Sequence, residues 1–96
     1  MIVRWTLEAL RDLDEIEQFI SYDDIDRALA FIGELLDFGD LLGDYPEKGT
    51  QAKWTTDTSI KELYYKEYTF IYEITDDEVI IHEVHNFAKM MRHFNR

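Results

Sequence analysis

The stretch that decides the fold is residues 60–85, IKELYYKEYTFIYEITDDEVIIHEVH. Through most of it polar and apolar side chains alternate with a period of two, which is typical of β-strands that bury one face. Two short polar breaks divide it into three strands that we predict at Ile60–Tyr65, Tyr68–Ile74 and Val79–His85. Strands joined by such short links must run antiparallel.

The middle of these strands has two different faces. Tyr68, Phe70, Tyr72 and Ile74 share one face, and Thr69, Ile71 and Glu73 share the other. We expect the aromatic face to be covered by helices and the second face to stay open.

Upstream of the strands, the apolar spacing becomes helical. Thr6 is a good N-cap, and Ala9, Leu13, Ile16 and Ile20 then recur at steps of four, three and four. After a break at residues 21–24, where Asp23 or Asp24 can cap, a second helix carries a broad apolar stripe: Ile25, Ala28, Leu29, Ile32, Leu35 and Leu36. The short break predicts an antiparallel helical hairpin.

The remaining segments complete one small domain over residues 1–96. Ile2–Trp5 is a strand that must join the later sheet, and residues 44–58 are expected to be loop. The architecture is β-α-α-β-β-β, an α+β fold with the hairpin on one face of a mostly antiparallel sheet. The helix residues expected to bury together against Tyr68, Phe70 and Tyr72 are Ala9, Leu13, Ile16, Leu29, Ile32 and Leu36.

Composition excludes several classes of protein. The 96 residues hold 21 acids and 10 bases, a net charge of −11, so direct binding to nucleic acid through the overall field is not expected. The acids are concentrated in residues 1–47, and the basic residues Lys89, Arg92 and Arg96 lie in the last ten. No cysteine is present, which excludes disulfides and thiolate metal sites. No apolar run could span a membrane, so we expect a cytoplasmic protein.

Taken in order, these motifs resemble the RelE/ParE superfamily of type II toxin–antitoxin toxins. VRWTLEALRDLDEIEQFI at residues 3–20 is similar to the family's opening, and Pro46–Gly49 to its Pro-x-x-Gly loop. Residues 60–89 are similar to its three-stranded second half. The first helix looks closer to the ParE-like branch. The resemblance implies a small toxin that a cognate antitoxin silences. ParE-like members poison DNA gyrase, whereas RelE-like members cut messenger RNA on the ribosome.

The chain departs from this pattern where RNA cleavage would need cations. Lys61 stands where the family usually has Arg, and Thr69 and Glu73 stand on a strand that usually carries Arg. After the last strand, where the family often shows His and then Arg, either His85 or Asn86 takes the His position and Lys89 the Arg position. A face that is usually basic has thus become neutral to acidic, which favours binding over cleavage.

Candidate site residues follow from both readings. For antitoxin or target binding they are Tyr64, Thr69, Ile71, Lys89 and Arg92. For a ribonuclease they are Lys61, His85, Lys89 and Arg92, with His85 a plausible acid–base group. His82 and His85 stand three apart on a strand, so we expect them on opposite faces, and no metal site or cofactor is expected.

Three functions remain open from the sequence. The leading hypothesis is a ParE-like toxin that acts by binding a target such as DNA gyrase and has a cognate antitoxin. The first alternative is a RelE-like, ribosome-dependent endoribonuclease. The second is a non-toxic acidic interaction module with the same fold. If an antitoxin docks across residues 1–47, its docking segment should be net positive, because that region carries 13 acids and 3 bases.

Overall fold

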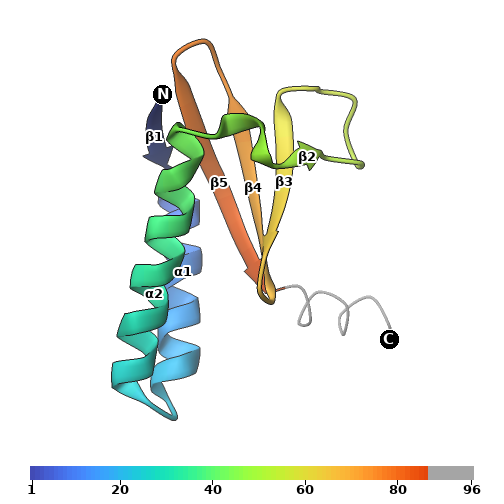
Figure 1. Cartoon of the computed structure of the whole chain (residues 1–96). Coiled ribbons are helices and arrows are strands. Elements are labelled where there is room, and N and C mark those ends of the chain that lie inside the picture. Colours follow the sequence, from blue (N-terminus) through green and yellow to red (C-terminus); the bar gives the residue numbers. More distant parts are fainter. Residues whose placement is uncertain (87–96) are drawn as a thin grey trace.

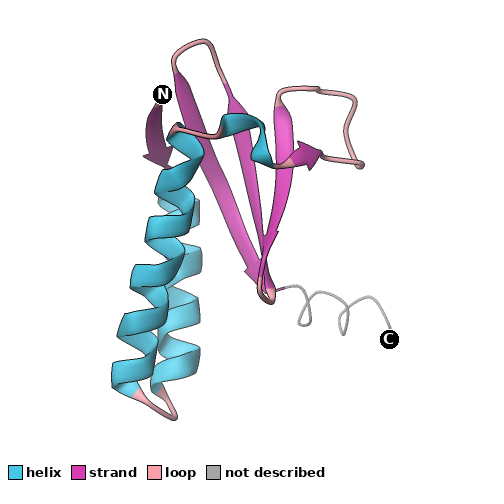
Figure 2. Ribbon diagram, in the orientation of Figure 1, coloured by secondary structure: helices cyan, strands magenta, loops and turns pink. Residues whose placement is uncertain are grey.

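The fold consists of a helical hairpin packed on one face of a five-stranded sheet (Figures 1 and 2). The structure is a computed structural model, and it describes residues 1–86. Its elements are β1 (Ile2–Trp5), α1 (Leu7–Ser21), α2 (Ile25–Asp40), two 3₁₀ turns (Leu41–Gly43 and Pro46–Lys48), β2 (Thr50–Gln51), β3 (Ile60–Tyr65), β4 (Tyr68–Ile74) and β5 (Glu78–Asn86).

The sheet order is β1-β5-β4-β3-β2. β1 pairs in parallel with β5, and the other neighbours are antiparallel, so the first strand joins the later sheet as predicted. The predicted α+β architecture with a helical hairpin on a mostly antiparallel sheet is confirmed. The sheet's second face carries no helix among the described residues (Figure 2).

Both helices begin at the side-chain caps that the sequence indicated. The Thr6 hydroxyl accepts a hydrogen bond from the Ala9 amide at 3.1 Å, and Asp24 accepts one from the Arg27 amide at 3.1 Å. Each cap satisfies an amide that the first turn leaves without a partner. Thr6 also donates to the His82 carbonyl, which fixes the start of α1 against β5.

The core lies between the hairpin and the aromatic face of β4. Ala9, Leu13, Ile16, Tyr68, Phe70 and Tyr72 are buried together, as predicted. The prediction for Leu29 is wrong, because its side chain is 57% exposed, while Ile32 and Leu36 are only partly buried. Ala28 and Leu35 are buried instead. The apolar stripe of α2 is wider than α1 and the sheet can cover, so part of it faces away from the core.

The connection between α2 and β3 is more ordered than the loop expected from the sequence. It contains two 3₁₀ turns and the short edge strand β2. The Tyr72 hydroxyl donates to the Pro46 carbonyl at 2.7 Å and accepts from the Gly49 amide at 2.9 Å. A methyl group on Gly49 would lie 2.7 Å from both the Tyr72 hydroxyl and the Glu62 carbonyl. The Pro-x-x-Gly segment is therefore a docking motif for Tyr72.

Candidate functional site

The open face of the sheet is formed by alternate residues of β3, β4 and β5. Strand register places Tyr64 beside Thr69 and His85, and Glu62 beside Ile71 and Glu83. Glu73 lies on the same face of β4. The side chains on this face are therefore mainly aromatic, aliphatic and acidic, with two histidines on β5.

A β-bulge on β5 brings those two histidines to the same face. Tyr72 pairs with Ile81 and Ile71 pairs with Glu83, so His82 is an extra residue on its strand. The His82 Nε2 atom lies 2.9 Å from the Glu73 carboxylate, which is on the open face. His85 pairs with Thr69 on that face too. The expectation that the two histidines point to opposite faces is therefore wrong, because the bulge breaks the strand's alternation.

Each histidine is paired with a carboxylate rather than left available as an isolated base. His82 contacts Glu73, and the His85 Nε2 atom lies 3.4 Å from the Glu83 carboxylate. The described residues contain no cluster of three His, Cys, Asp or Glu side chains that could hold a metal ion.

Where β1 ends, an aspartate from α1 completes the hydrogen bonding of β5. The Asp12 Oδ2 atom accepts a hydrogen bond from the Val84 amide at 2.9 Å. Burial raises the pKa of Asp12 above its usual value of 3.8, opposed by the Val84 hydrogen bond and by the nearby His85. This contact fixes α1 to the strand that carries both histidines.

The open face is hollowed beside the bulge. A cavity of about 320 Å³ is lined by two isoleucines, an exposed indole, a histidine and two carboxylates. Its lining residues are Glu8, Trp54, Ile60, Ile71, His82 and Glu83. Within residues 1–86, no lysine or arginine lines it. A phosphate would meet carboxylates here, whereas cleavage of RNA requires cations that stabilise developing negative charge.

The structure separates the residues proposed for RNA cleavage. Lys61 registers beside Tyr72, on the helix-facing side of the sheet, and its ammonium lies 3.4 Å from the Glu47 carboxylate. His85 lies on the opposite, open face. Lys61 and His85 therefore do not form one site, because their side chains lie on opposite faces of the sheet. Lys89 and Arg92 lie outside the described residues.

The residues proposed for binding differ in their accessibility. Tyr64 is 59% exposed, Ile71 is half-buried and Thr69 is only 7% exposed. Thr69 sits between Tyr64 and His85 in the sheet, and its small side chain is covered there. Of the described candidates, Tyr64 and Ile71 present the larger surfaces to a partner.

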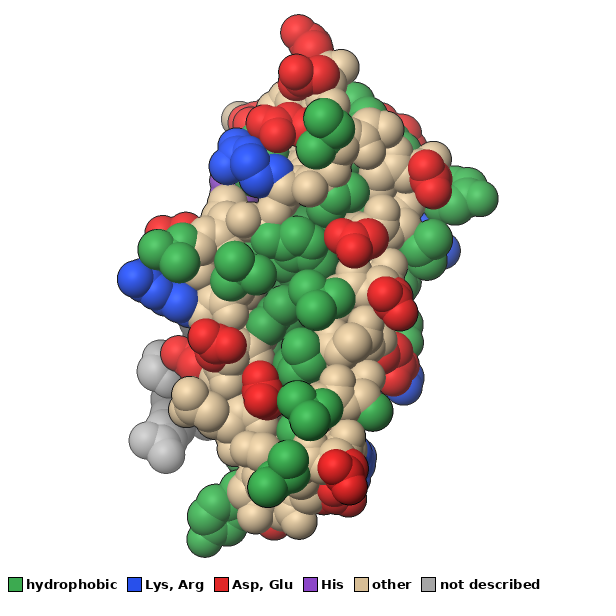
Figure 3. Space-filling model, turned by 90° about the vertical axis from the view of Figure 1, so that its left-hand side faces the viewer, with side chains coloured by type: hydrophobic (Ala, Val, Ile, Leu, Met, Phe, Trp, Pro, Cys, Tyr) green, Lys and Arg blue, Asp and Glu red, His purple; other side chains and the backbone are tan. Residues whose placement is uncertain are grey.

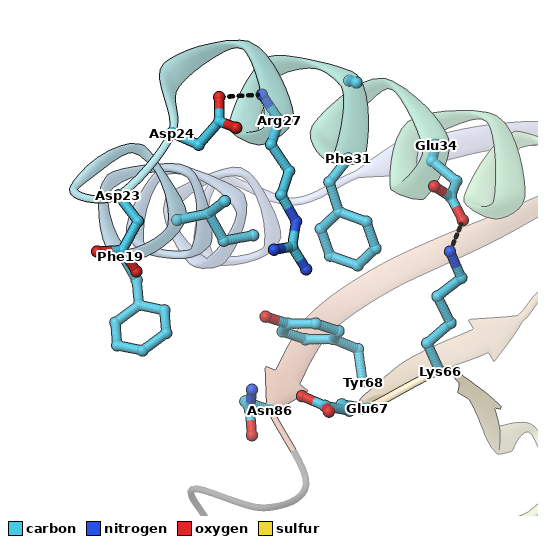
Figure 4. Close-up of a pocket in the computed structure, with 12 residues that line it drawn as sticks. Phe19, Asp23, Asp24, Arg27, Phe31, Glu34, Lys66, Glu67, Tyr68 and Asn86 are labelled. Atoms are coloured by element: carbon cyan, nitrogen blue, oxygen red, sulfur yellow. Dashed lines mark hydrogen bonds and ion pairs between the residues drawn. The ribbon is translucent and has the colours of Figure 1, made fainter.

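A second hollow, which the sequence did not indicate, lies between the hairpin tip and the β3–β4 turn (Figure 4). It measures about 420 Å³, and the side chains of Arg27 and Phe31 point into it toward Tyr68. Across this hollow the Glu34 carboxylate lies 2.5 Å from the Lys66 ammonium, and it also accepts a hydrogen bond from the Tyr65 hydroxyl. Lys66 lowers the pKa of Glu34, and Glu34 raises the pKa of Lys66.

The two hollows differ in the charge of the side chains that line them. Arg27 and Lys66 line the hollow at the hairpin tip, whereas the cavity on the open face has no basic side chain among its described lining residues except His82. No helix of this part of the chain is long and apolar enough to cross a membrane.

Comparison with known proteins agrees with this architecture. A family model described as the ParE toxin of the type II toxin–antitoxin system parDE matches residues 3–86. "Putative toxin Y4kP" of Sinorhizobium fredii (strain NBRC 101917 / NGR234) is 35% identical over 85 residues, which cover 86% of this chain and 85% of that protein.

Two solved structures share the fold. The chromosomal ParDE system from P. aeruginosa superposes with a TM-score of 0.75 at 17% identity, covering 90% of this chain and 95% of that one. The RelBE2 toxin–antitoxin complex from Mycobacterium tuberculosis gives 0.62 at 21% identity, covering 88% of each chain. At these identities the likeness is one of fold.

Proposed function

The chain belongs to the ParE family of type II toxin–antitoxin toxins, and from that premise we propose that it acts by binding a target protein such as DNA gyrase and is silenced by a cognate antitoxin. Gyrase is the target that the family resemblance implies. The antitoxin is supported by the two structural neighbours, which are toxin–antitoxin systems.

The composition of the open face favours a binding function over RNA cleavage. Glu62, Glu73 and Glu83 occupy it, and Lys61 lies on the other side of the sheet. The transition state for attack by a 2′-hydroxyl builds negative charge on the phosphate, and three carboxylates disfavour that charge. A RelE-like ribonuclease is therefore the weaker hypothesis.

Growth and RNA integrity test this proposal together. Induced expression of the chain should arrest bacterial growth, and co-expression of the adjacent gene should restore it. Messenger RNA on purified ribosomes should stay intact when the protein is added. Ribosome-dependent cleavage that is lost on His85→Ala would replace binding by a ribonuclease mechanism. Normal growth without the neighbour would favour the non-toxic interaction module.

A further inference from the structure

An apolar band lies on the part of α2 that the core leaves uncovered. Its members are spaced four, three and four residues apart, so they share one side of the helix: Ile25, Leu29, Ile32 and Leu36. Ile25 and Leu29 are 66% and 57% exposed, and the other two are half-buried. Figure 3 shows hydrophobic side chains gathered in a band along the outer face of the hairpin, with acidic side chains beside it. Contiguous apolar surface of this kind is typical of an interaction site.

The charged residues beside the band indicate which kind of partner binds it. Asp26, Asp37 and Asp40 are exposed on α2, and residues 1–47 hold 13 acids and 3 bases. Pairing the band with a second copy would bring these carboxylates together, and like charges across an interface are unfavourable. A helix with an apolar stripe and lysine or arginine on its flanks would match both the band and its acidic border.

Gly33 gives an independent sign of close approach from outside. It stands in the interior of α2, about one turn from both Leu29 and Leu36. Glycine is a poor helix former, yet Gly33 has no left-handed backbone angle, and a methyl group built on it would meet no atom of residues 1–86 within 4 Å outside its own turn of helix. Neither local conformation nor internal packing needs a glycine here. The close crossing of another helix does, because a side chain at the crossing point holds two backbones apart.

We propose that the outer face of the hairpin docks a cationic amphipathic helix of the antitoxin, which crosses α2 at Gly33. This inference rests on the proposed function and specifies the surface and the chemistry of its partner. The helix lays its apolar stripe on Leu29 and Leu36, and its long basic side chains reach the acidic border of the band.

The test compares Gly33→Gln with Ala30→Gln in the full chain, each titrated with the purified product of the adjacent gene. Ala30 is exposed on the same helix but lines the groove facing the sheet, so it is a matched control. Gly33→Gln should weaken the complex by roughly tenfold or more, whereas Ala30→Gln should leave it within about twofold. Affinity should also fall as sodium chloride is raised.

Stability of the free variant separates docking from folding. Gly33→Ala should raise the melting temperature of the free chain by about 4–8 °C, because alanine favours the helix and the space is open. A Gly33→Gln chain that is at least as stable as the parent and binds weakly supports the docking surface.

Three outcomes would contradict parts of the account. If the wild-type chain forms the complex and Gly33→Gln leaves its affinity unchanged, the docking surface is wrong. The same holds if Gly33→Gln and Ala30→Gln lower the affinity equally. Either result leaves the toxin–antitoxin function standing. A dimer of the chain alone that Gly33→Gln dissociates overturns the choice of partner. No complex with the wild-type chain removes the antitoxin from the proposed function itself.

Discussion

Tyr72→Phe should destabilise the fold by releasing the Pro46–Gly49 segment. The phenol ring is fully buried, and its hydroxyl donates to Pro46 and accepts from Gly49. Burial raises the pKa of the Tyr72 hydroxyl, so it stays neutral at physiological pH. Removing one oxygen leaves the ring's packing unchanged but takes away both hydrogen bonds. At about 0.5–1.5 kcal/mol net for each bond, the loss in unfolding free energy should be about 1–3 kcal/mol.

Urea unfolding followed by circular dichroism measures this loss. With an m-value of about 1–2 kcal/mol/M, the midpoint should fall by roughly 0.5–3 M at unchanged m. Tyr22→Phe is the matched control, because Tyr22 is 92% exposed and should shift stability by less than about 0.5 kcal/mol. If Tyr72→Phe unfolds at the same midpoint as the parent, the segment is not held by this hydroxyl and the reasoning fails.

The remaining predictions address the core, α1 and the histidines. Leu35→Ala should cost about 2–5 kcal/mol in a urea titration while Leu29→Ala costs less than about 0.5 kcal/mol, and equal losses would mean that α2 is rotated differently. Because the folded pKa of Asp12 is raised, its ionisation above pH 3.8 disfavours folding. The stability of the parent should therefore decline as pH rises through that range, and Asp12→Asn should remove this decline. Asp12→Ala should lower the free energy of unfolding by about 1–3 kcal/mol, because it leaves the Val84 amide unpaired. Identical plots of stability against pH for the parent and Asp12→Asn would refute the role of Asp12. His85→Ala should leave growth arrest intact, whereas loss of toxicity in a folded variant would implicate His85 directly.

The sequence predicted the fold well where the pattern was local. The alternation in β4 identified its aromatic face, and Thr6 and Asp24 marked both helix starts. Those signals depend on neighbouring residues alone. The parallel pairing of β1 with β5 was inferred only as membership of the sheet, because strand partners far apart in sequence leave no periodic signal.

The candidate site was predicted less well, for two physical reasons. The bulge at His82 shifts the alternation of β5 by one residue, and nothing in the sequence IIHEVH marks the extra residue. Lys61 was grouped with His85 by family position, although strand alternation from Tyr72 places it on the covered face. The surplus apolar residues of α2 could not be divided into core and surface until the limited area of α1 and the sheet was known.

The most direct test of the central claim, toxicity through binding of a protein target, is supercoiling of relaxed plasmid DNA by purified gyrase in the presence of this chain. The account predicts inhibition that rises with the concentration of the chain and is reversed when the purified product of the adjacent gene is added in equal amount. Gyrase that works unimpeded, together with ribosome-bound messenger RNA that is cut by the same preparation, would contradict it.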